Sequence, residues 1–243
     1  MRATSLVLAS VLASLIAASP AAAASLTHDY LFQNTLADSL GGPSLTSLGG
    51  TVGVGEYTFG AEQGLSLSGA LTPAQSADYS IYLNFELDTL TGFRKILDFK
   101  NLASDNGMYN LSTALNYFNF STGPTGAFAP GVFAQVVLTR DNTTGLVVGY
   151  VNGVQQISFT DNTSDAVFNA ANNIINFFQD DNVTTGRESS SGAVSEIRIY
   201  DGALTATEVA DLSNTATPEP ASLVLAGAGL LLCLSRRRGK FVG

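Results

Sequence analysis

Apolar and polar side chains alternate along residues 79–88, and this pattern limits the fold more than any other feature of the sequence. Tyr79, Ile81, Leu83, Phe85 and Leu87 alternate with Ser80, Tyr82, Asn84, Glu86 and Asp88. A period of two predicts a strand with one face buried in a core and the other facing solvent.

Further strands of similar character are predicted at short intervals along the chain. They lie at residues 93–99, 115–120, 133–140, 146–151, 155–159 and 194–200. Turn signals separate them, and Asn152-Gly153 suits a two-residue hairpin because both residues accept a positive φ. No ten-residue helical period stands between the strands, so parallel βαβ units are disfavoured. The pattern predicts an all-β fold, an antiparallel two-sheet sandwich.

One short helix is predicted after the last strand. Thr205 and Glu208 stand at the spacing of a capping box, in which each side chain satisfies an exposed amide donor of the other residue. Leu204 and Val209 then have the spacing of a hydrophobic staple. We expect the helix to end near Leu212, with residues 213–217 as a linker.

The charge distribution excludes some partners. All twenty acidic residues lie between Asp29 and Glu219, and five of the eleven basic ones lie at the two ends of the chain. The stretch between holds six basic residues and therefore has a net charge of −14. Such a surface repels phosphate backbones and anionic lipids, so nucleic acid is not an expected partner. The only cysteine, Cys233, excludes an intrachain disulfide.

The first residues have the composition of a secretory signal peptide. Arg2 is the positive n-region, residues 6–18 form an apolar run, and small residues at 21–24 suit a signal peptidase. We expect residues 1–24 to be removed, with cleavage just before Ser25 or at the equally suitable Ala23. The alternative is a retained membrane anchor.

The C-terminal segment predicts a short membrane helix. Pro218, Glu219 and Pro220 precede an apolar run at 221–234, and an arginine-rich cluster follows at 236–240. Fourteen helical residues span about 21 Å, against about 30 Å of hydrocarbon, so residues 221–235 make a marginal span. The basic cluster places the C-terminus in the cytoplasm by the positive-inside rule.

The stretch "TPEPASLVLAGAGLLLCLSRRRGK" resembles the PEP-CTERM sorting signal of Gram-negative bacteria. The resemblance implies that residues 218–240 are a sorting signal, processed by an exosortase-type enzyme that recognises Pro218, Glu219 and Pro220. It further implies an exported protein, held transiently in the inner membrane and then delivered to the cell surface, outer membrane or extracellular matrix. The alternative is an ordinary C-terminal anchor.

The body at residues 25–212 is long enough for one sandwich with a real core. "AVSEIRIYDGALTATEVADL" resembles the closing strand and helix of concanavalin A-like, laminin G-type jelly rolls. "FAQVVLTRDNTTGLVVGYVNGVQQISF" is similar to their central hairpin, "DYSIYLNFELDTLTGFRKILDF" to earlier strands and "HDYLFQNTLADSLGG" to the opening strand. The family often has Trp where Phe133 stands. We expect Phe133 to fill a core site and no tryptophan platform for a sugar.

Catalysis is not expected. Glucanases of this superfamily carry a Glu-x-Asp-x-Glu pattern, and Glu86 and Asp88 begin it without the second Glu. We interpret both as residues of a solvent-facing strand surface. The only histidine, His28, is expected on the surface of a strand, which leaves a Ser-His arrangement without support.

Calcium is the one cofactor that the sequence suggests. Asp180, Asp181 and Glu188 bring oxygen ligands into one loop, the ligands that Ca²⁺ prefers, and laminin G-like relatives often hold one such ion. Adjacent strand residues point to opposite faces, so at most one of the two aspartates is expected to be a ligand. The alternative is a solvated loop in which Arg187 neutralises an acid.

These features together predict a non-enzymatic exported surface or matrix protein that binds a glycan or a protein. Its family resemblance associates it with exopolysaccharide and biofilm. Two alternatives stay open: a glycan-active hydrolase of the same superfamily, and a purely structural envelope protein. The four tyrosines at 82, 109, 117 and 150 suit either sugar stacking or cross-strand packing, and we favour packing.

Overall fold

The computed structural model describes residues 24–168, 173–183 and 188–214, and all structural statements concern these residues. The strands are β1 (Ser25–Tyr30), β2 (Thr46–Ser47), β3 (Thr51–Val52), β4 (Tyr57–Phe59), β5 (Leu65–Ser68), β6 (Tyr79–Leu87), β7 (Phe93–Asp98), β8 (Gly107–Leu111), β9 (Ala114–Tyr117), β10 (Ser121–Thr122), β11 (Ala134–Arg140), β12 (Leu146–Val151), β13 (Val154–Thr160), β14 (Ile174–Phe177) and β15 (Gly192–Asp201). The one helix among the described residues is α1 (Ala206–Asn214).

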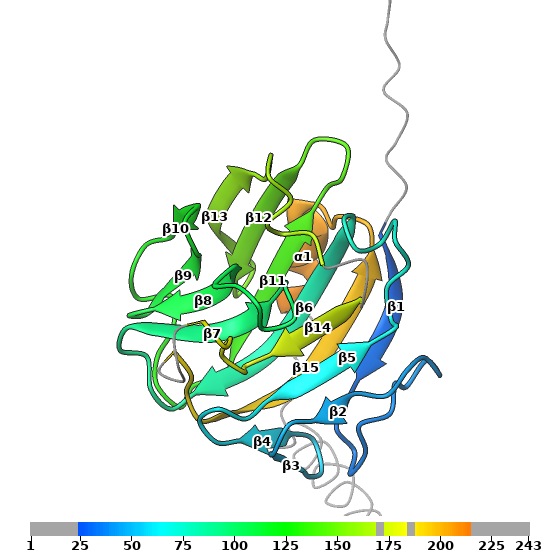
Figure 1. Ribbon diagram of the computed structural model, residues 1–243, viewed down its shortest axis with the longest axis vertical. Coiled ribbons are helices and arrows are strands. Elements are labelled where there is room, and N and C mark those ends of the chain that lie inside the picture. Colours follow the sequence, from blue (N-terminus) through cyan, green and yellow to red (C-terminus); the bar gives the residue numbers. More distant parts are fainter. Residues whose placement is uncertain (1–23, 169–172, 184–187, 215–243) are drawn as a thin grey trace, which may run out of the picture.

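The strands form two sheets that pack face to face (Figure 1). The eight-stranded sheet has the order β13-β12-β11-β6-β15-β4-β3, with β1 pairing with β15. The seven-stranded sheet has the order β10-β9-β8-β7-β14-β5-β2. The strand pairs that join these strands are antiparallel. This arrangement confirms the predicted all-β, two-sheet sandwich with one short C-terminal helix.

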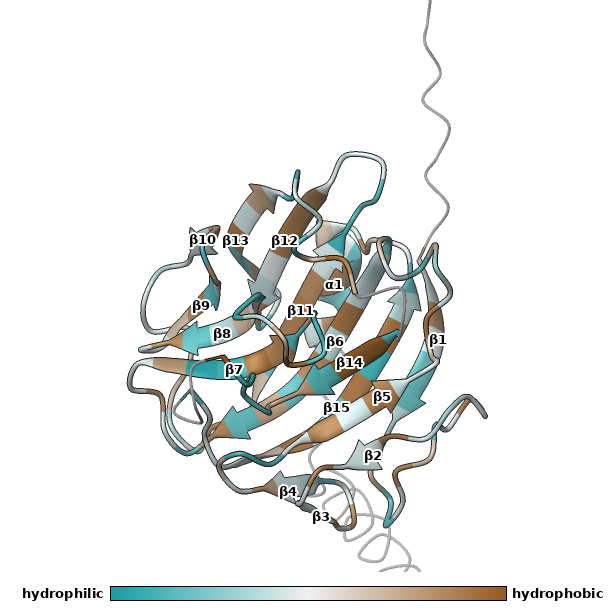
Figure 2. Cartoon of the chain, viewed as in Figure 1, coloured by the Kyte–Doolittle hydropathy of each residue, from teal (hydrophilic) through white to brown (hydrophobic). Residues whose placement is uncertain are grey.

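Aromatic side chains fill much of the space between the sheets. Phe99 lies between Tyr117 and Phe168, with ring centroids 5.5 and 4.5 Å away, and Phe178 stacks on Phe59 at 4.5 Å. Burial of each such ring stabilises the fold by about 1.5–3 kcal/mol. Figure 2 shows hydrophobic and hydrophilic residues alternating along the strands, as expected for strands with one face in a core.

Strand β6 confirms one half of the alternation prediction and corrects the other. Ile81, Leu83 and Phe85 lie in the core between the sheets, as expected. On the opposite face, however, Ser80 is 0% and Tyr82 is 3% exposed, so this face is not solvent-facing along its whole length. The reason is α1, which packs over this part of the eight-stranded sheet.

Helix α1 begins with the predicted capping box. The backbone N–H of Thr205 donates to Glu208 Oε2 at 2.8 Å, and that of Glu208 donates to Thr205 Oγ1 at 3.3 Å. Leu204 and Val209 are both buried in one apolar cluster, which agrees with the staple. The other members of this cluster come from the sheet: Tyr82, Val137, Val148, Tyr150 and Tyr200. The helix ends at Asn214, two residues later than predicted.

Most predicted strands are present, with changed ends. The strand expected at 115–120 stops at Tyr117, because Asn119 has a φ of 64° and turns the chain toward β10. The hairpin at Asn152-Gly153 is confirmed, with φ values of 49° and 77° and a pairing of Val151 with Val154.

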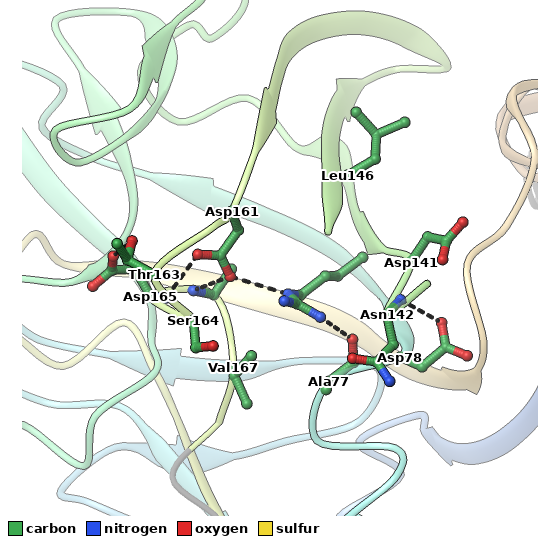
Figure 3. Close-up of polar contacts among 12 residues, drawn as sticks. Ala77, Asp78, Asp141, Asn142, Leu146, Asp161, Thr163, Ser164, Asp165 and Val167 are labelled. Atoms are coloured by element: carbon green, nitrogen blue, oxygen red, sulfur yellow. Dashed lines mark hydrogen bonds and ion pairs between the residues drawn. The ribbon is translucent and has the colours of Figure 1, made fainter. Parts of the chain in front are cut away.

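A buried ion pair fixes the loop that follows β13 (Figure 3). Nε of Arg140 lies 3.1 Å from Asp161 Oδ2, and the two side chains are 5% and 0% exposed. Asp161 also accepts hydrogen bonds from the backbone N–H groups of Asp165 and Ala166 at 2.8 and 3.0 Å. Lys100 donates to two carbonyl oxygens of the same loop, those of Ser164 and Val167.

Candidate functional site

The three acidic residues predicted as calcium ligands surround one lysine, Lys95 of β7. Its Nζ lies 2.8 Å from Asp181 Oδ2, and its backbone N–H donates to the carbonyl oxygen of Glu188 at 2.6 Å. The backbone N–H of Glu188 in turn donates to Asp180 Oδ2 at 3.2 Å. The structure therefore brings the three residues close to one another, Glu188 through its backbone and the two aspartates through their side chains. We call Lys95, Asp105, Asp180, Asp181 and Glu188 the Lys95 cluster.

A β-bulge in β7 positions Lys95 on the outer face of the seven-stranded sheet. The register of β7 with β8 shifts between Lys95 and Leu97, and both Ile96 and Leu97 are buried in the core. An extra residue in one strand re-aims its neighbours in this way. Lys95 then stands opposite Tyr109, with its Nζ 4.3 Å from the centre of the tyrosine ring. Phe93 meets the same ring edge-on at 5.5 Å.

The Lys95 cluster holds more acid than base, and three of its five members are buried while Asp105 and Glu188 are half-buried. Lys95 is 1% exposed, and Asp180 and Asp181 are each 3% exposed. These two aspartates are therefore not solvated, and Lys95 is a cation beside Asp181; Arg187, which the solvated-loop alternative names, lies outside the described residues. Sequence reasoning missed Lys95 and Asp105; a lysine inside a strand that was correctly predicted, Phe93–Asp98, was the available signal.

The acids of the cluster differ in pKa. Burial raises the pKa of Asp105, and the charge of Asp181 adds to that rise. Burial and nearby carboxylates likewise raise the pKa of Asp180 and that of Glu188. For Asp180, the hydrogen bond from the N–H of Glu188 lowers the pKa but does not outweigh burial. Burial also opposes ionisation of Asp181, but hydrogen bonds from Lys95 and from the N–H of Val183 outweigh it and lower its pKa. Asp181 is therefore the carboxylate that holds its charge.

The cluster does not have the geometry of a metal site. Among the described residues, no three His, Cys, Asp or Glu side chains come together in a way that could hold a metal ion. The buried Oδ1 atoms of Asp105 and Asp180 have no hydrogen-bond partner there, while Lys95 supplies positive charge beside Asp181. The calcium site stays a prediction.

A shallow pocket of about 340 Å³ opens at one end of the sandwich. Its lining comes from the loops after β6, β8 and β10: Asp88, Thr89, Leu90, Thr91, Ser112, Thr113 and Pro130. Most of these side chains carry hydroxyl or carboxylate oxygens. We call this site the rim pocket. Sequence reasoning did not identify it, because its loops are far apart in the chain.

The turn that carries Ser112 and Thr113 is strained. Their φ values are 45° and 80°, a region that a β-branched residue such as Thr113 rarely adopts. Hydrogen bonds hold it there: Thr113 Oγ1 accepts from the N–H of Gly126, and Thr113 O accepts from the N–H of Ala127. A two-residue hairpin between β8 and β9, with Leu111 paired to Ala114, requires positive φ at both positions, so the sheet accounts for this conformation.

Glu86 and Asp88 are the residues of the incomplete glucanase pattern: Asp88 lines the rim pocket, and Glu86 stands two residues before it on β6. Asp88 is exposed, and its Oδ2 accepts a hydrogen bond from the hydroxyl of Ser191 at 2.5 Å. Glu86 is half-buried, and burial together with the charges of Asp88 and Glu56 raises its pKa. The position of the missing second Glu is held by Leu90, which is 6% exposed.

Two sequence-based placements are wrong. Phe133 is 40% exposed, because it stands just before β11 on the face that Gln135 and Val137 share, away from the core. His28 is 8% exposed and not a surface residue: its Nδ1 lies 2.7 Å from Asp38 Oδ2, and its Nε2 lies 3.1 Å from the carbonyl oxygen of Ala70.

The tyrosine interpretation is confirmed. The exposed fractions of Tyr82, Tyr109, Tyr117 and Tyr150 are 3%, 0%, 0% and 6%, so all four are packing residues. The signal peptide and the sorting residues Pro218, Glu219 and Pro220 lie outside the described residues, as does the expected membrane segment 221–235. Within the described residues, no helix has the length and apolar character needed to span a membrane.

A protein-family model described as the concanavalin A-like lectin/glucanases superfamily matches residues 59–210. The match covers more than half of the sequence, and the chain belongs to this superfamily. A second family model, the PEP-CTERM protein-sorting motif, matches residues 216–238 and confirms the resemblance of the C-terminal segment. This motif implies an exported protein of Gram-negative bacteria. Comparison with curated proteins gives no match.

Several solved structures share the fold. Domain 4 of an extracellular arabinanase of family GH43 from Geobacillus stearothermophilus, in complex with arabinotriose, has a TM-score of 0.60 at 22% identity, covering 79% of this chain and 99% of that domain. Trypanosoma rangeli sialidase has a TM-score of 0.59 at 14% identity, covering 77% of this chain and 32% of the sialidase. The binding domain of botulinum neurotoxin serotype D has a TM-score of 0.56 at 12% identity, covering 78% and 51%. These identities establish a shared fold and nothing further.

Proposed function

We propose that this chain is a non-enzymatic, exported surface or matrix protein whose jelly roll binds a glycan outside the cell. The observation that carries the proposal is the combination, on one chain, of a concanavalin A-like domain and a PEP-CTERM motif. The first supports binding of an extracellular ligand, a glycan or alternatively a protein. The second supports delivery to the envelope, in association with exopolysaccharide and biofilm.

In this proposal the two ends of the chain act only in delivery. Residues 1–24 direct export and are removed, and residues 221–235 hold the protein in the inner membrane until an exosortase-type enzyme processes it near Pro218. Mass spectrometry of the protein from its native host tests this directly. We expect an N-terminus near Ser25 and loss of the basic cluster at 236–240. A mature form that keeps this cluster would leave a plain membrane anchor.

The rim pocket is the proposed glycan site. Sugars present hydroxyl groups that both donate and accept hydrogen bonds, and the carboxylate of Asp88 and the hydroxyls of Thr89 and Ser112 match that chemistry. Leu90 and Pro130 add an apolar surface for the carbon face of a ring. An ionised acceptor gives hydrogen bonds about twice as strong as a neutral one, so Asp88 is expected to dominate the affinity.

A glycan array with the 25–217 fragment, run with and without Ca²⁺, tests the proposal. For a glycan that binds, Asp88→Asn is expected to weaken affinity about tenfold or more, the effect of losing one charged hydrogen bond. Asp211→Asn is the matched control, because Asp211 is an exposed carboxylate on α1. Equal affinity of both variants would exclude the rim pocket as the site.

The array also separates the alternatives. A structural envelope protein would bind no glycan on it. A hydrolase would release products from a bound glycan and would lose this activity in Glu86→Gln, since Glu86 is the half-buried carboxyl with a raised pKa. Hydrolysis of that kind would overturn the non-enzymatic proposal.

A further inference from the structure

The β-sandwich contains an ion pair, Lys95 and Asp181, in which both side chains are completely buried. The side chains of Lys95 and Asp181 are both 0% exposed, and Nζ lies 2.8 Å from Oδ2. Moving an ammonium and a carboxylate out of water is costly, and their mutual attraction often fails to recover that cost. A reaction that replaces the two charges by one neutral group removes the cost altogether.

The two side chains are arranged for such a reaction. Lysine amines act as nucleophiles when a neighbouring group accepts the proton and water is excluded. A nitrogen held at hydrogen-bond distance from a carboxyl group is already close to its carbon, which removes most of the entropic barrier to attack. Tyr109 shields one side, with its ring 4.3 Å from Nζ and its hydroxyl 3.5 Å from Asp181 Oδ2.

A third group can move the protons. Asp105 lies beside Asp181: the hydroxyl of Tyr109 contacts the backbone oxygen of Asp105 at 3.0 Å and Asp181 Oδ2 at 3.5 Å, and the charge of Asp181 helps to raise the pKa of Asp105. Asp105 is only partly buried, and its Oδ1 is enclosed without a hydrogen-bond partner among the described residues. It can therefore give a proton to a departing oxygen of Asp181 and receive one from the attacking nitrogen.

We propose that Lys95 and Asp181 condense to an intramolecular amide, with Asp105 transferring the protons. A bond forms between Nζ of Lys95 and Cγ of Asp181, and the bond from Cγ to one carboxyl oxygen breaks. The ammonium loses two of its three protons, and both leave with that oxygen as one water molecule. The product amide is neutral and keeps one N–H, Asp105 ends as it began, and no oxidant, reductant or cofactor takes part.

The bond would be a covalent cross-link in a body that has no disulfide, because the single cysteine of the chain is Cys233. The linked residues are 86 positions apart, so the amide would close a large loop and tie β7 to the segment after β14. Cross-links over long loops restrict the unfolded chain and stabilise the folded one. This inference does not depend on the proposed glycan site.

Peptide mapping of the full chain tests the proposal. The purified protein is denatured, digested with trypsin and analysed by mass spectrometry. We expect no cleavage after Lys95 and one branched peptide that joins the Lys95 and Asp181 segments, with a mass lower by one water than the sum of its parts. Cleavage after Lys95 together with an unmodified linear peptide containing Asp181 would overturn the proposal.

Variants test the roles of the groups. Lys95→Arg keeps the positive charge and is expected to give linear peptides only. Asp181→Asn is expected to give the same branched product as the wild type, with ammonia leaving in place of water. Asp105→Asn keeps both linked residues and is expected to lose the branch; a branch at the wild-type level would overturn the role of Asp105. Lys100→Arg is the control and should keep the branch, because Lys100 Nζ contacts carbonyl oxygens of another loop.

Discussion

Replacing Asp161 by alanine is expected to destabilise the domain strongly. The carboxylate of Asp161 accepts hydrogen bonds from Arg140 and from two backbone N–H groups, and Asp161 is 4% exposed (Figure 3). The substitution leaves the guanidinium of Arg140, also 4% exposed, buried without its counter-charge. It also leaves the N–H groups of Asp165 and Ala166 without this acceptor.

The magnitude follows from the burial. Removing one partner of a buried ion pair costs about 3–5 kcal/mol, because the remaining charge cannot be resolvated. A domain of this size has about 5–15 kcal/mol of stability in total, so the variant should lose a large fraction of it. In domains of about 150–250 residues, 1 kcal/mol corresponds to roughly 2–4 °C, so the Tm should fall by about 10 °C.

Urea unfolding of the 25–217 fragment measures the change in the free energy of unfolding. Far-ultraviolet circular dichroism serves as the signal, because the chain has no tryptophan for a fluorescence measurement. Asp78→Ala is the matched control, because it also removes one carboxylate. The Asp78 carboxylate makes only an exposed and long contact, accepting from the N–H of Asn142 at 3.4 Å. We expect the control to change stability by about 0.5 kcal/mol or less. If Asp161→Ala costs no more than the control, the reasoning on buried charge is refuted.

A second substitution separates charge from packing. Adding Arg140→Met to Asp161→Ala removes the unpaired charge and keeps an apolar side chain of similar length. The double variant is expected to be more stable than Asp161→Ala alone, because the penalty of the uncompensated guanidinium disappears. A double variant that is less stable by a further 1–2 kcal/mol or so would assign the loss to packing instead.

Three further predictions concern pH, the helix cap and calcium. Burial opposes ionisation of Asp38, but hydrogen bonds from backbone N–H groups and from His28 lower its pKa, so its stabilisation is complete above about pH 4 and is lost as the pH falls through the lowered value. Asp38→Asn should therefore cost stability at pH 7, and the difference from the wild type in urea unfolding should close in acid; a gap that is constant with pH contradicts this. Thr205→Ala should cost about 1 kcal/mol, and a loss of less than a few tenths would mean that the capping box contributes little. If the Asp180–Glu188 loop binds Ca²⁺, the Tm should rise in millimolar Ca²⁺ but not in Mg²⁺ at the same concentration, and Glu188→Gln should lose that rise. Equal effects of both ions would indicate general screening of the acidic body.

The sequence predicts the long strands well because their alternation reflects burial directly. It misses β5, β8 and β14, which have only four or five residues each, too few to show a period. Strand β8 is further hidden because it begins at Gly107, a residue that reads as part of a turn. Short strands of this kind are defined by their neighbours in the sheet and not by their own composition.

The site is less predictable than the fold, for physical reasons. The acidic residues at 180–188 can be identified from the sequence. Lys95, however, lies 86 positions before Asp181, and the β-bulge that positions it cannot be predicted from the pattern of apolar and polar residues. The same holds for Tyr82, which looks solvent-facing on its strand until α1 covers it. Pairings of residues distant in the chain depend on topology, which local periodicity does not encode.

The position of β15 in the sheet has a consequence for the timing of folding. This strand is the last one among the described residues, yet it pairs with β1, β4 and β6, and Ser25 pairs with Asp201. A chain that emerges from the ribosome or a translocon with its N-terminus first has no partner for β1 until nearly the whole domain has appeared. Contacts this distant in sequence form slowly. The eight-stranded sheet can therefore close only after β15 has emerged, although β1 is among the first residues of the domain to appear.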